Sequence, residues 1–184
     1  MQGKQGDKTP EIWDAYYPDG TLAGVDLIRG EEIPPQYRHA VSEVFVIHKD
    51  GTILLMQRDF AKPGYPGFWE SGAGGSVLKG ETFEEGAYRE LKEETGISAH
   101  ELHPNYEVVT HDTIYKGFVC HTDAPKDSVT LQEGETIGYQ WVSKEEFMGI
   151  FVTGQFVTSL RDRLRDFVTN GFRTDALQGR DGTL

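Results

Sequence analysis

The sequence has a single cysteine, no long apolar run and few basic residues for its length. The one cysteine, Cys120, cannot form an internal disulfide, which is typical of proteins that fold in a reducing compartment. No run of about 18 apolar residues is present, so we expect no membrane-spanning helix. A basic segment followed by an apolar one is also missing, which argues against a secretory signal. These absences predict a cytoplasmic protein with no membrane partner.

Basic side chains are outnumbered by acidic ones, 18 against 30, and the formal net charge is −12. So acidic a protein is repelled by phosphate backbones and anionic lipids, and we expect no nucleic-acid partner. The length of 184 residues, without repeats or a change in composition, predicts one domain over residues 1–184. Within it we expect flexible ends at 1–11 and 173–184 and an N-terminal hairpin at 12–28.

What the chain does have is a sequence pattern typical of a short, acidic helix with clear ends. Thr82 followed by Glu85 forms a capping box, in which the hydroxyl and the carboxylate each satisfy a backbone amide of the first turn. Gly96 ends the helix, because glycine adopts the left-handed conformation at little cost. The sequence therefore predicts a helix over residues 83–95.

One face of this helix changes from apolar to acidic along its length. At about 100° per residue, Phe83 and Ala87 lie on the same face as Glu90 and Glu94, with Glu93 at its edge. A solvated acidic surface would instead place the acids opposite the apolar stripe. Carboxylates that face a protein interior repel one another unless a cation neutralises them. Oxygen ligands favour hard cations, so the pattern predicts a Mg²⁺ or Mn²⁺ site.

The region around this helix resembles the signature box of the Nudix hydrolases. All nine positions of that box are filled, by Gly75, Glu81, Arg89-Glu90-Leu91, Glu93-Glu94 and Gly96-Ile97. The resemblance implies an α+β protein with the Nudix fold, an α/β/α sandwich around a mixed β-sheet, here with an N-terminal β-hairpin. It also implies metal-dependent cleavage of a diphosphate linkage, in a nucleoside diphosphate linked to another group or a similar compound.

The resemblance further implies roles for residues of the box. Glu90, Glu93, Glu94 and the carbonyl of Gly75 are expected to bind the metal. Arg89 is expected to orient the glutamates and to pair with Glu81, so that the catalytic set is formed by Glu93, Glu94, Arg89 and Glu81.

The catalytic base is left open by the sequence. It must lie within hydrogen-bond reach of the attacking water. We favour Glu93 or Glu94, and Glu133 and Glu135 are further candidates because they lie on a loop just before a predicted strand.

The substrate is expected to be a small-molecule diphosphate of undetermined class. Arg58, Phe68, Trp69 and Gly74 are candidate substrate-binding residues, although aromatic residues in strands more often belong to a core. The sequence does not discriminate among acyl-CoA, nucleotide sugars, nucleoside triphosphates and prenyl diphosphates as substrates.

Residues 13–97 also resemble a narrower branch, the isopentenyl-diphosphate isomerases and related hydrolases. The shared features are Trp13-Asp14, the Asp19-Gly20 turn, Tyr37 to His39 and Pro66-Gly67-Phe68-Trp69. The isomerases need a cysteine and a metal-binding histidine at positions that are Gly74 and Ser76 here, which argues against isomerase activity. A second alternative is a non-catalytic Nudix module that senses a nucleotide.

The remaining segments follow strand and helix patterns. Strands are expected at 12–17, 21–28, 41–48, 52–57, 106–110, 113–121 and 136–142. Helices are expected from the capping box of Ser143 and Glu146 to just before Gly149, and at 155–169. We expect the hairpin at 12–28 to support the sheet or a homodimer contact and to carry no chemistry, since its apolar side chains need a partner surface.

Overall fold

The structure is a computed structural model that describes residues 10–174. The predicted flexible ends therefore lie largely outside the described residues. In chain order the elements are β1 (Ile12–Tyr16), β2 (Leu22–Ile28), β3 (His39–His48), β4 (Ile53–Arg58), β5 (Trp69–Ser71), β6 (Ala73–Ser76), α1 (Phe83–Thr95), β7 (Leu102–Val109), β8 (Thr113–Thr122), a short 3-10 turn (Lys126–Ser128), β9 (Thr136–Val142), α2 (Lys144–Val152) and α3 (Thr158–Thr169).

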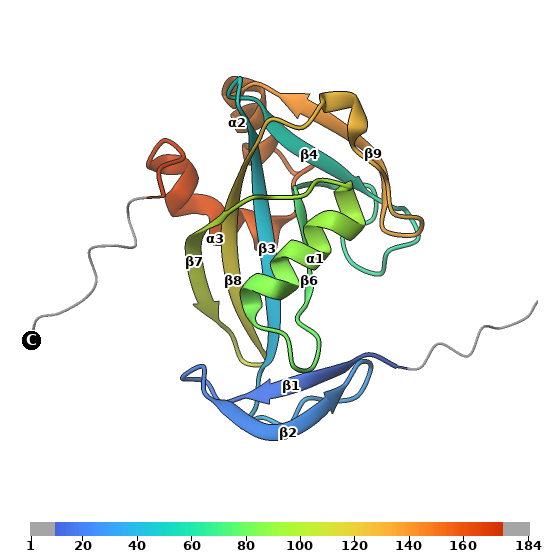
Figure 1. The fold of residues 1–184 in the computed structure, drawn as a ribbon, viewed down its shortest axis with the longest axis vertical. Coiled ribbons are helices and arrows are strands. Elements are labelled where there is room, and N and C mark those ends of the chain that lie inside the picture. The colour runs from blue at the N-terminus through green and yellow to red at the C-terminus, as the bar shows by residue number, and fades with distance from the viewer. Residues whose placement is uncertain (1–9, 175–184) are drawn as a thin grey trace, which may run out of the picture.

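A seven-stranded mixed sheet forms the centre of the molecule (Figure 1). Its strands follow the order β5-β4-β3-β8-β7, with β6 paired to β3 and β9 paired to β4. Strands β3 and β8 run parallel, while the other pairs within the sheet are antiparallel. The pairing of β3 with β6 places Ser42 opposite Gly75 and Glu43 opposite Gly74. This register brings the start of the box against the central strand.

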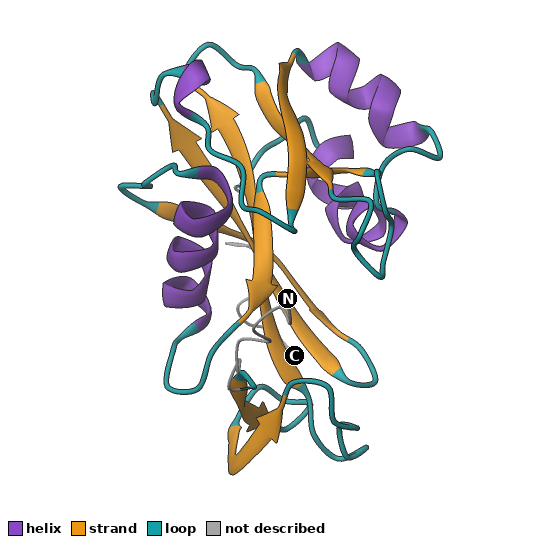
Figure 2. Ribbon diagram, turned by 90° about the vertical axis from the view of Figure 1, so that its right-hand side faces the viewer, coloured by secondary structure: helices purple, strands orange, loops and turns teal. Residues whose placement is uncertain are grey.

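Helices cover both faces of the sheet, as Figure 2 shows, with α1 on one side and α2 and α3 on the other. Alternate residues of β3 explain the two layers. Val44 and Val46 belong to the core cluster that contains Leu91 of α1, whereas Phe45 and Ile47 belong to the cluster formed with α2 and α3. The predicted α/β/α sandwich around a mixed sheet is confirmed, because each strand face has its own apolar partner.

Helix α1 has the ends that the sequence predicts. The amide of Glu85 donates to the Thr82 hydroxyl, the Glu85 carboxylate accepts from the amide of Thr82, and Gly96 lies at φ 75°. Its buried side includes Ala87 and Leu91 and continues to Glu94. A local capping pattern and an apolar stripe suffice to specify this helix.

Two helix boundaries differ from the prediction. Helix α2 does not end before Gly149 but continues to Val152, because Phe147 and Phe151 anchor it in the core. Helix α3 begins at Thr158 rather than at residue 155. Just before the helix, Phe156 forms an isolated β-bridge with Trp69, and the amide of Trp69 donates to the carbonyl of Gln155. These boundaries were missed because they depend on tertiary packing.

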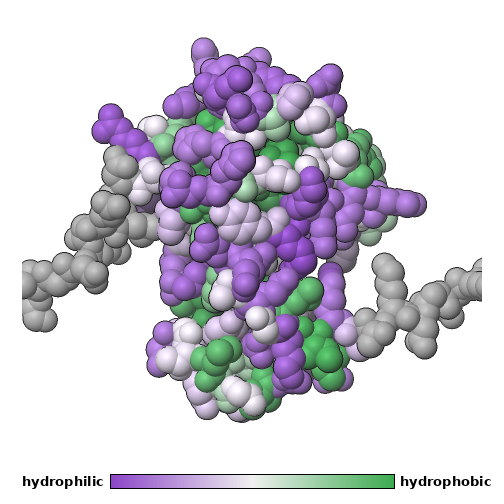
Figure 3. Space-filling view, viewed as in Figure 1, coloured by the Kyte–Doolittle hydropathy of each residue, from purple (hydrophilic) through white to green (hydrophobic). Residues whose placement is uncertain are grey.

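The N-terminal hairpin, β1 paired with β2, lies at one end of the main sheet (Figure 1). The Trp13 ring stacks on His39 of β3, with ring centroids 4.7 Å apart. Asp14 accepts a hydrogen bond of 2.7 Å from the amide of Gly80. Apolar side chains remain exposed on the hairpin, including Leu22 at 62% and Val25 at 40%, and Figure 3 shows apolar surface gathered there.

Candidate active site

Three of the box glutamates, Glu90, Glu93 and Glu94, line a cavity of about 330 Å³ beside β6 and the C-terminal half of α1. The cavity carries more negative than positive charge. Its carboxylates are those of Glu11, Glu90, Glu93, Glu94 and Glu135, and its cationic side chains are those of Arg29, Lys62 and Arg89. A polyanionic diphosphate would be repelled from such a cavity unless further positive charge accompanied it.

Arg89 lies at the centre of the acidic residues. Its Nε donates to Glu81 Oε1 at 2.7 Å, and its Nη1 donates to Glu90 Oε1 at 2.6 Å and to Glu93 Oε2 at 3.3 Å. Its Nη2 also donates to the carbonyl oxygen of Ser76, at 2.9 Å. Hydrogen bonding to Arg89 lowers the pKa of Glu81. The guanidinium thus ties the loop before α1 to the glutamates on the helix.

Glu94 is the most deeply placed of these carboxylates, with a relative exposure of 8%. The amide of Gly74 donates to its Oε2 at 3.1 Å. Burial, followed by the negative charges of Glu70 and Glu90, raises the pKa of Glu94 to about 8. Burial also raises the pKa of Glu90. Both carboxylates are therefore held where a negative charge is poorly solvated.

Glu93 lies at the rim of the cavity, since its side chain is 50% exposed. Gly75 lies next to the buried carboxylates, and a Cβ atom at this position would overlap the side chain of Glu90. A side chain at Gly75 would occupy the space where the Glu90 carboxylate meets the backbone. Glycine is the only residue that leaves this approach open.

The donor set fits a hard divalent cation in its chemistry. It consists of carboxylate and carbonyl oxygens in a cavity with excess negative charge. Within residues 10–174, however, no three His, Cys, Asp or Glu side chains are gathered closely enough to hold a metal ion. In this structure Glu90 accepts a hydrogen bond from Arg89, and Glu94 accepts one from the amide of Gly74.

The sequence did not predict two cationic residues of this cavity. Lys62 comes from the loop between β4 and β5 and pairs with Glu135, while Arg29 follows β2 and pairs with Glu11 at 2.7 Å. The hairpin is therefore flanked by two residues, Glu11 and Arg29, that line the cavity. No sequence pattern marks isolated basic residues in loops as part of a site, and only the tertiary fold brings these two close to the box.

The two base candidates outside the box are placed differently. Glu135 lines the cavity, whereas Glu133 is exposed on the same loop and is not among the lining residues. The ion pair with Lys62 holds the Glu135 carboxylate.

The candidate substrate-binding residues separate into two groups. Arg58 and Gly74 line a second cavity of about 170 Å³, and Gly74 borders the first cavity as well. Phe68 and Trp69 are partly buried and pack against the core on the side of α2 and α3; neither lines these two cavities. Glu70, which the sequence analysis did not single out, pairs with Arg58 at 2.8 Å.

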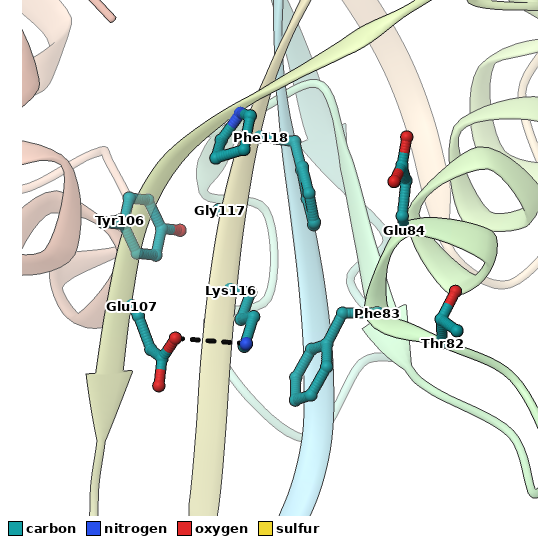
Figure 4. Close-up of a pocket in the computed structure, with 9 residues that line it drawn as sticks. Thr82, Phe83, Glu84, Tyr106, Glu107, Lys116, Gly117 and Phe118 are labelled. Carbon is teal, nitrogen blue, oxygen red and sulfur yellow. Dashed lines mark ion pairs between the residues drawn. The ribbon is translucent and has the colours of Figure 1, made fainter. Parts of the chain in front are cut away.

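A further cavity, of about 490 Å³, lies between the first turn of α1 and strands β7 and β8 (Figure 4). Its charged residues include Glu107 and Lys116, which pair at 3.1 Å, and Lys116 also lies over the Phe83 ring. The glutamates at the C-terminal half of α1 do not reach it. This cavity is therefore separate from the one that Glu90, Glu93 and Glu94 line.

Comparison with known proteins identifies the family. A family model of the NUDIX domain matches residues 36–166. The chain belongs to the Nudix family. It is 33% identical over 151 residues to an uncharacterized Nudix hydrolase, lmo0368, of Listeria monocytogenes serovar 1/2a, covering 80% of this chain and 88% of the relative. The family places the chain among hydrolases that act on pyrophosphate bonds.

Solved structures show the same fold at low sequence identity. DR0079 from Deinococcus radiodurans superposes with a TM-score of 0.69 at 19% identity. The match covers 89% of this chain and 100% of DR0079. The MutT protein from Methanosarcina mazei Go1 gives a TM-score of 0.57 at 24% identity, covering 78% of this chain and 100% of that one. These matches confirm the predicted Nudix fold.

An isopentenyl-diphosphate Delta-isomerase of Klebsiella pneumoniae strain 342 is also similar, at 26% identity over 117 residues, which are 60% of this chain and 64% of the isomerase. The structure places Cys120 in the core beneath α1, where burial raises its pKa to about 11. Cys120 therefore cannot replace the reactive cysteine that the isomerases need at the position of Gly74. In residues 10–174, no helix is long and apolar enough to cross a membrane.

Proposed function

We propose that the protein is a Mg²⁺- or Mn²⁺-dependent hydrolase of the diphosphate linkage in a nucleoside diphosphate joined to another group. One observation carries the proposal: Glu90 and Glu94 point from the buried side of α1 toward the Gly74-Gly75 backbone, in a cavity with excess negative charge. Hydrolysis adds water to one phosphorus and breaks the bridging P–O bond, and the products are two phosphate monoesters.

Glu90, Glu93, Glu94 and the carbonyl of Gly75 would hold the metal. When bound, such an ion neutralises phosphate charge and lowers the pKa of a water molecule. Arg89 acts as a positioning residue, because its hydrogen bonds to Glu81 and Glu90 fix the side chains on which the site depends.

The base is assigned to Glu94 or Glu93. Glu94 lies buried in the cavity and Glu93 lies at its rim, so both carboxylates border the space in which the attacking water must lie. Glu135 is held in an ion pair by Lys62, which restrains its carboxylate. Lys62 and Arg29 border the same cavity and are suited to contact the phosphate oxygens.

The test is a panel of diphosphates with Mg²⁺ or Mn²⁺, in which phosphate is measured after addition of a phosphatase. Glu93→Gln and Glu94→Gln should each lower turnover by about two orders of magnitude or more while the fold is retained. Glu145→Gln serves as the matched control, since Glu145 is an exposed residue in the first turn of α2. Wild-type activity in both box variants would refute the assignment.

A further inference from the structure

The second cavity lies between α3 and strands β3, β5 and β6 and shares Gly74 with the first. Two ion pairs dominate its lining. Arg58 pairs with Glu70 at 2.8 Å, and Arg163 of α3 pairs with Glu43 of β3. Because Gly74 borders both cavities, the second cavity adjoins the first. A group attached to a diphosphate in the first cavity can therefore extend into the second.

Both pairs are largely withdrawn from solvent. The side chains of Arg58 and Glu70 are 17% and 21% exposed, and those of Arg163 and Glu43 are 11% and 15% exposed. Two positive and two negative charges balance, so the lining is polar without a net charge. An anionic group therefore has no net electrostatic reason to enter the second cavity.

Both guanidinium groups line the cavity and keep unused hydrogen-bonding capacity. Arg58 donates from Nε to the carbonyl of Gly64 and from Nη1 to Glu70. Arg163 donates from Nε and Nη2 to Glu43. Since a guanidinium carries five N–H groups, these bonds leave donors for a ligand. A hydrocarbon chain in this cavity would displace water from those donors. Because it has no acceptor, it would not replace the hydrogen bonds that the donors made with water.

Tyr65 supplies an aromatic wall under backbone constraint. It lies at φ 52°, one of two non-glycine residues of positive φ in the described part of the chain. Its hydroxyl lies 2.7 Å from the Thr158 hydroxyl, and its ring packs edge-on against Phe68. Unusual backbone conformations of bulky residues persist where the surroundings fix them, often at binding sites. The loop is thus held with this tyrosine in the cavity lining.

The size of the cavity limits what it can hold. Pockets that enclose a whole drug-sized ligand measure about 300–1,000 Å³, whereas this one measures about 170 Å³. It is therefore suited to one ring and not to an entire nucleotide.

We propose that this second cavity binds the group attached to the diphosphate and selects a compact, polar, uncharged ring, such as the sugar or base of a nucleotide, over a hydrocarbon chain. The proposal rests on the proposed function, because the diphosphate must occupy the first cavity. It separates nucleotide-linked substrates from prenyl diphosphates, two classes between which the box does not discriminate.

The test replaces one ion pair of the second cavity by apolar residues of similar size. The variant is Glu43→Leu/Arg163→Met/Tyr106→Phe, in which the third change removes the hydroxyl that donates to Glu43. Replacement of a buried ion pair as a unit often preserves stability. The control is Glu107→Leu/Lys116→Met, an ion pair that lines neither cavity at Gly74. Thermal unfolding checks that both proteins are folded.

The substrates are UDP-glucose, ADP-ribose, geranyl diphosphate and methyl diphosphate, the last of which has almost no attached group. In the triple variant, kcat/KM for the two nucleotide sugars should fall by about tenfold or more, and that for methyl diphosphate should change by less than about twofold. An equal fall for all substrates, an unchanged preference, or a wild-type preference for geranyl diphosphate would overturn the inference.

Failure of the proposed function gives a different result. In that case the wild-type protein hydrolyses none of the four compounds with Mg²⁺ or Mn²⁺. Calorimetric titration with ADP-ribose then decides the inference by itself. Tighter binding to wild type than to the triple variant supports it, and equal affinity refutes it.

Discussion

The carboxylate of Glu90 occupies the space that a Cβ atom on Gly75 would need. Gly75→Ala should therefore displace Glu90, which can swing away because the overlap involves the far end of a flexible side chain. The fold should survive, whereas kcat/KM should fall by about a hundredfold, since small displacements of catalytic groups have effects of that size. Steady-state kinetics and thermal unfolding of the same preparation measure the two effects.

Gly149→Ala is the control for this experiment. A Cβ atom at Gly149 meets no atom within 4 Å, and the residue lies inside α2. Alanine is favoured over glycine in a helix interior by about 1 kcal/mol, so this variant should be fully active and at least as stable as wild type. If Gly75→Ala were as active as the control, the close approach of the Glu90 carboxylate to residue 75 would not be needed for activity.

The second prediction concerns Arg29, which is 59% exposed and pairs with Glu11 beside the box. If Arg29 contacts phosphate, Arg29→Gln should raise KM by about threefold to tenfold with little change in kcat, because an exposed charge contributes about 1 kcal/mol. Arg165→Gln is the matched control, since Arg165 is 64% exposed and also forms an ion pair, with Asp162. Equal KM values for the two variants would show that Arg29 has no role in binding.

The result for Arg29 also tests the expectation that the hairpin carries no chemistry. Residues 12–28 themselves line neither cavity at Gly74, but the two residues that flank them, Glu11 and Arg29, line the first. A raised KM would make the hairpin the support of a binding residue. Its contribution would then be to hold Arg29 over the box.

The sequence predicts those parts of the fold and site that local chemistry specifies. Helix α1 begins and ends where Thr82 and Gly96 require, and the glutamates follow from their helical spacing. What could not be predicted depends on contacts between distant residues. Glu70 and Arg163 are ordinary charged residues in the sequence, and only the packing of α3 on the sheet brings Arg163 to Glu43 and places both pairs around one cavity.

The third prediction is a pH dependence of stability that arises at the contact between Trp13 and His39. Burial lowers the pKa of His39 below its ordinary value of 6.5, although the carbonyl and charge of Asp112 act in the opposite direction. The folded state therefore holds a neutral ring, while the unfolded state takes up a proton below pH 6.5. Stability that is present above the unfolded pKa is lost as the pH falls toward the folded pKa.

His39→Phe removes this proton-binding difference while an aromatic ring still faces Trp13. The free energy of unfolding in urea should fall between pH 7.5 and pH 5.5 by a larger amount in wild type than in the variant. Comparison of the two proteins cancels the contributions of the other histidines. Equal slopes for both would show that His39 titrates alike in the folded and unfolded chain.

The last prediction separates hydrolysis from isomerisation, because an isopentenyl-diphosphate Delta-isomerase is among the relatives. Isomerisation adds a proton to one carbon of the alkene and removes a proton from another, so two acid/base groups must flank the hydrocarbon. Gly74 offers no such group, and the thiol of Cys120 is fully buried in another part of the core. Moreover, the cavity next to Gly74 is lined by ion pairs.

We therefore expect no conversion of isopentenyl to dimethylallyl diphosphate by the wild-type protein. Incubation with Mg²⁺ and isopentenyl diphosphate in D₂O, followed by NMR, measures deuterium that enters the allylic position. The signal should equal that of a sample without enzyme, even if the diphosphate itself binds at the box. Deuterium above that level would mean that groups other than a thiol at residue 74 move protons on the alkene, and the assignment as a hydrolase would have to be abandoned.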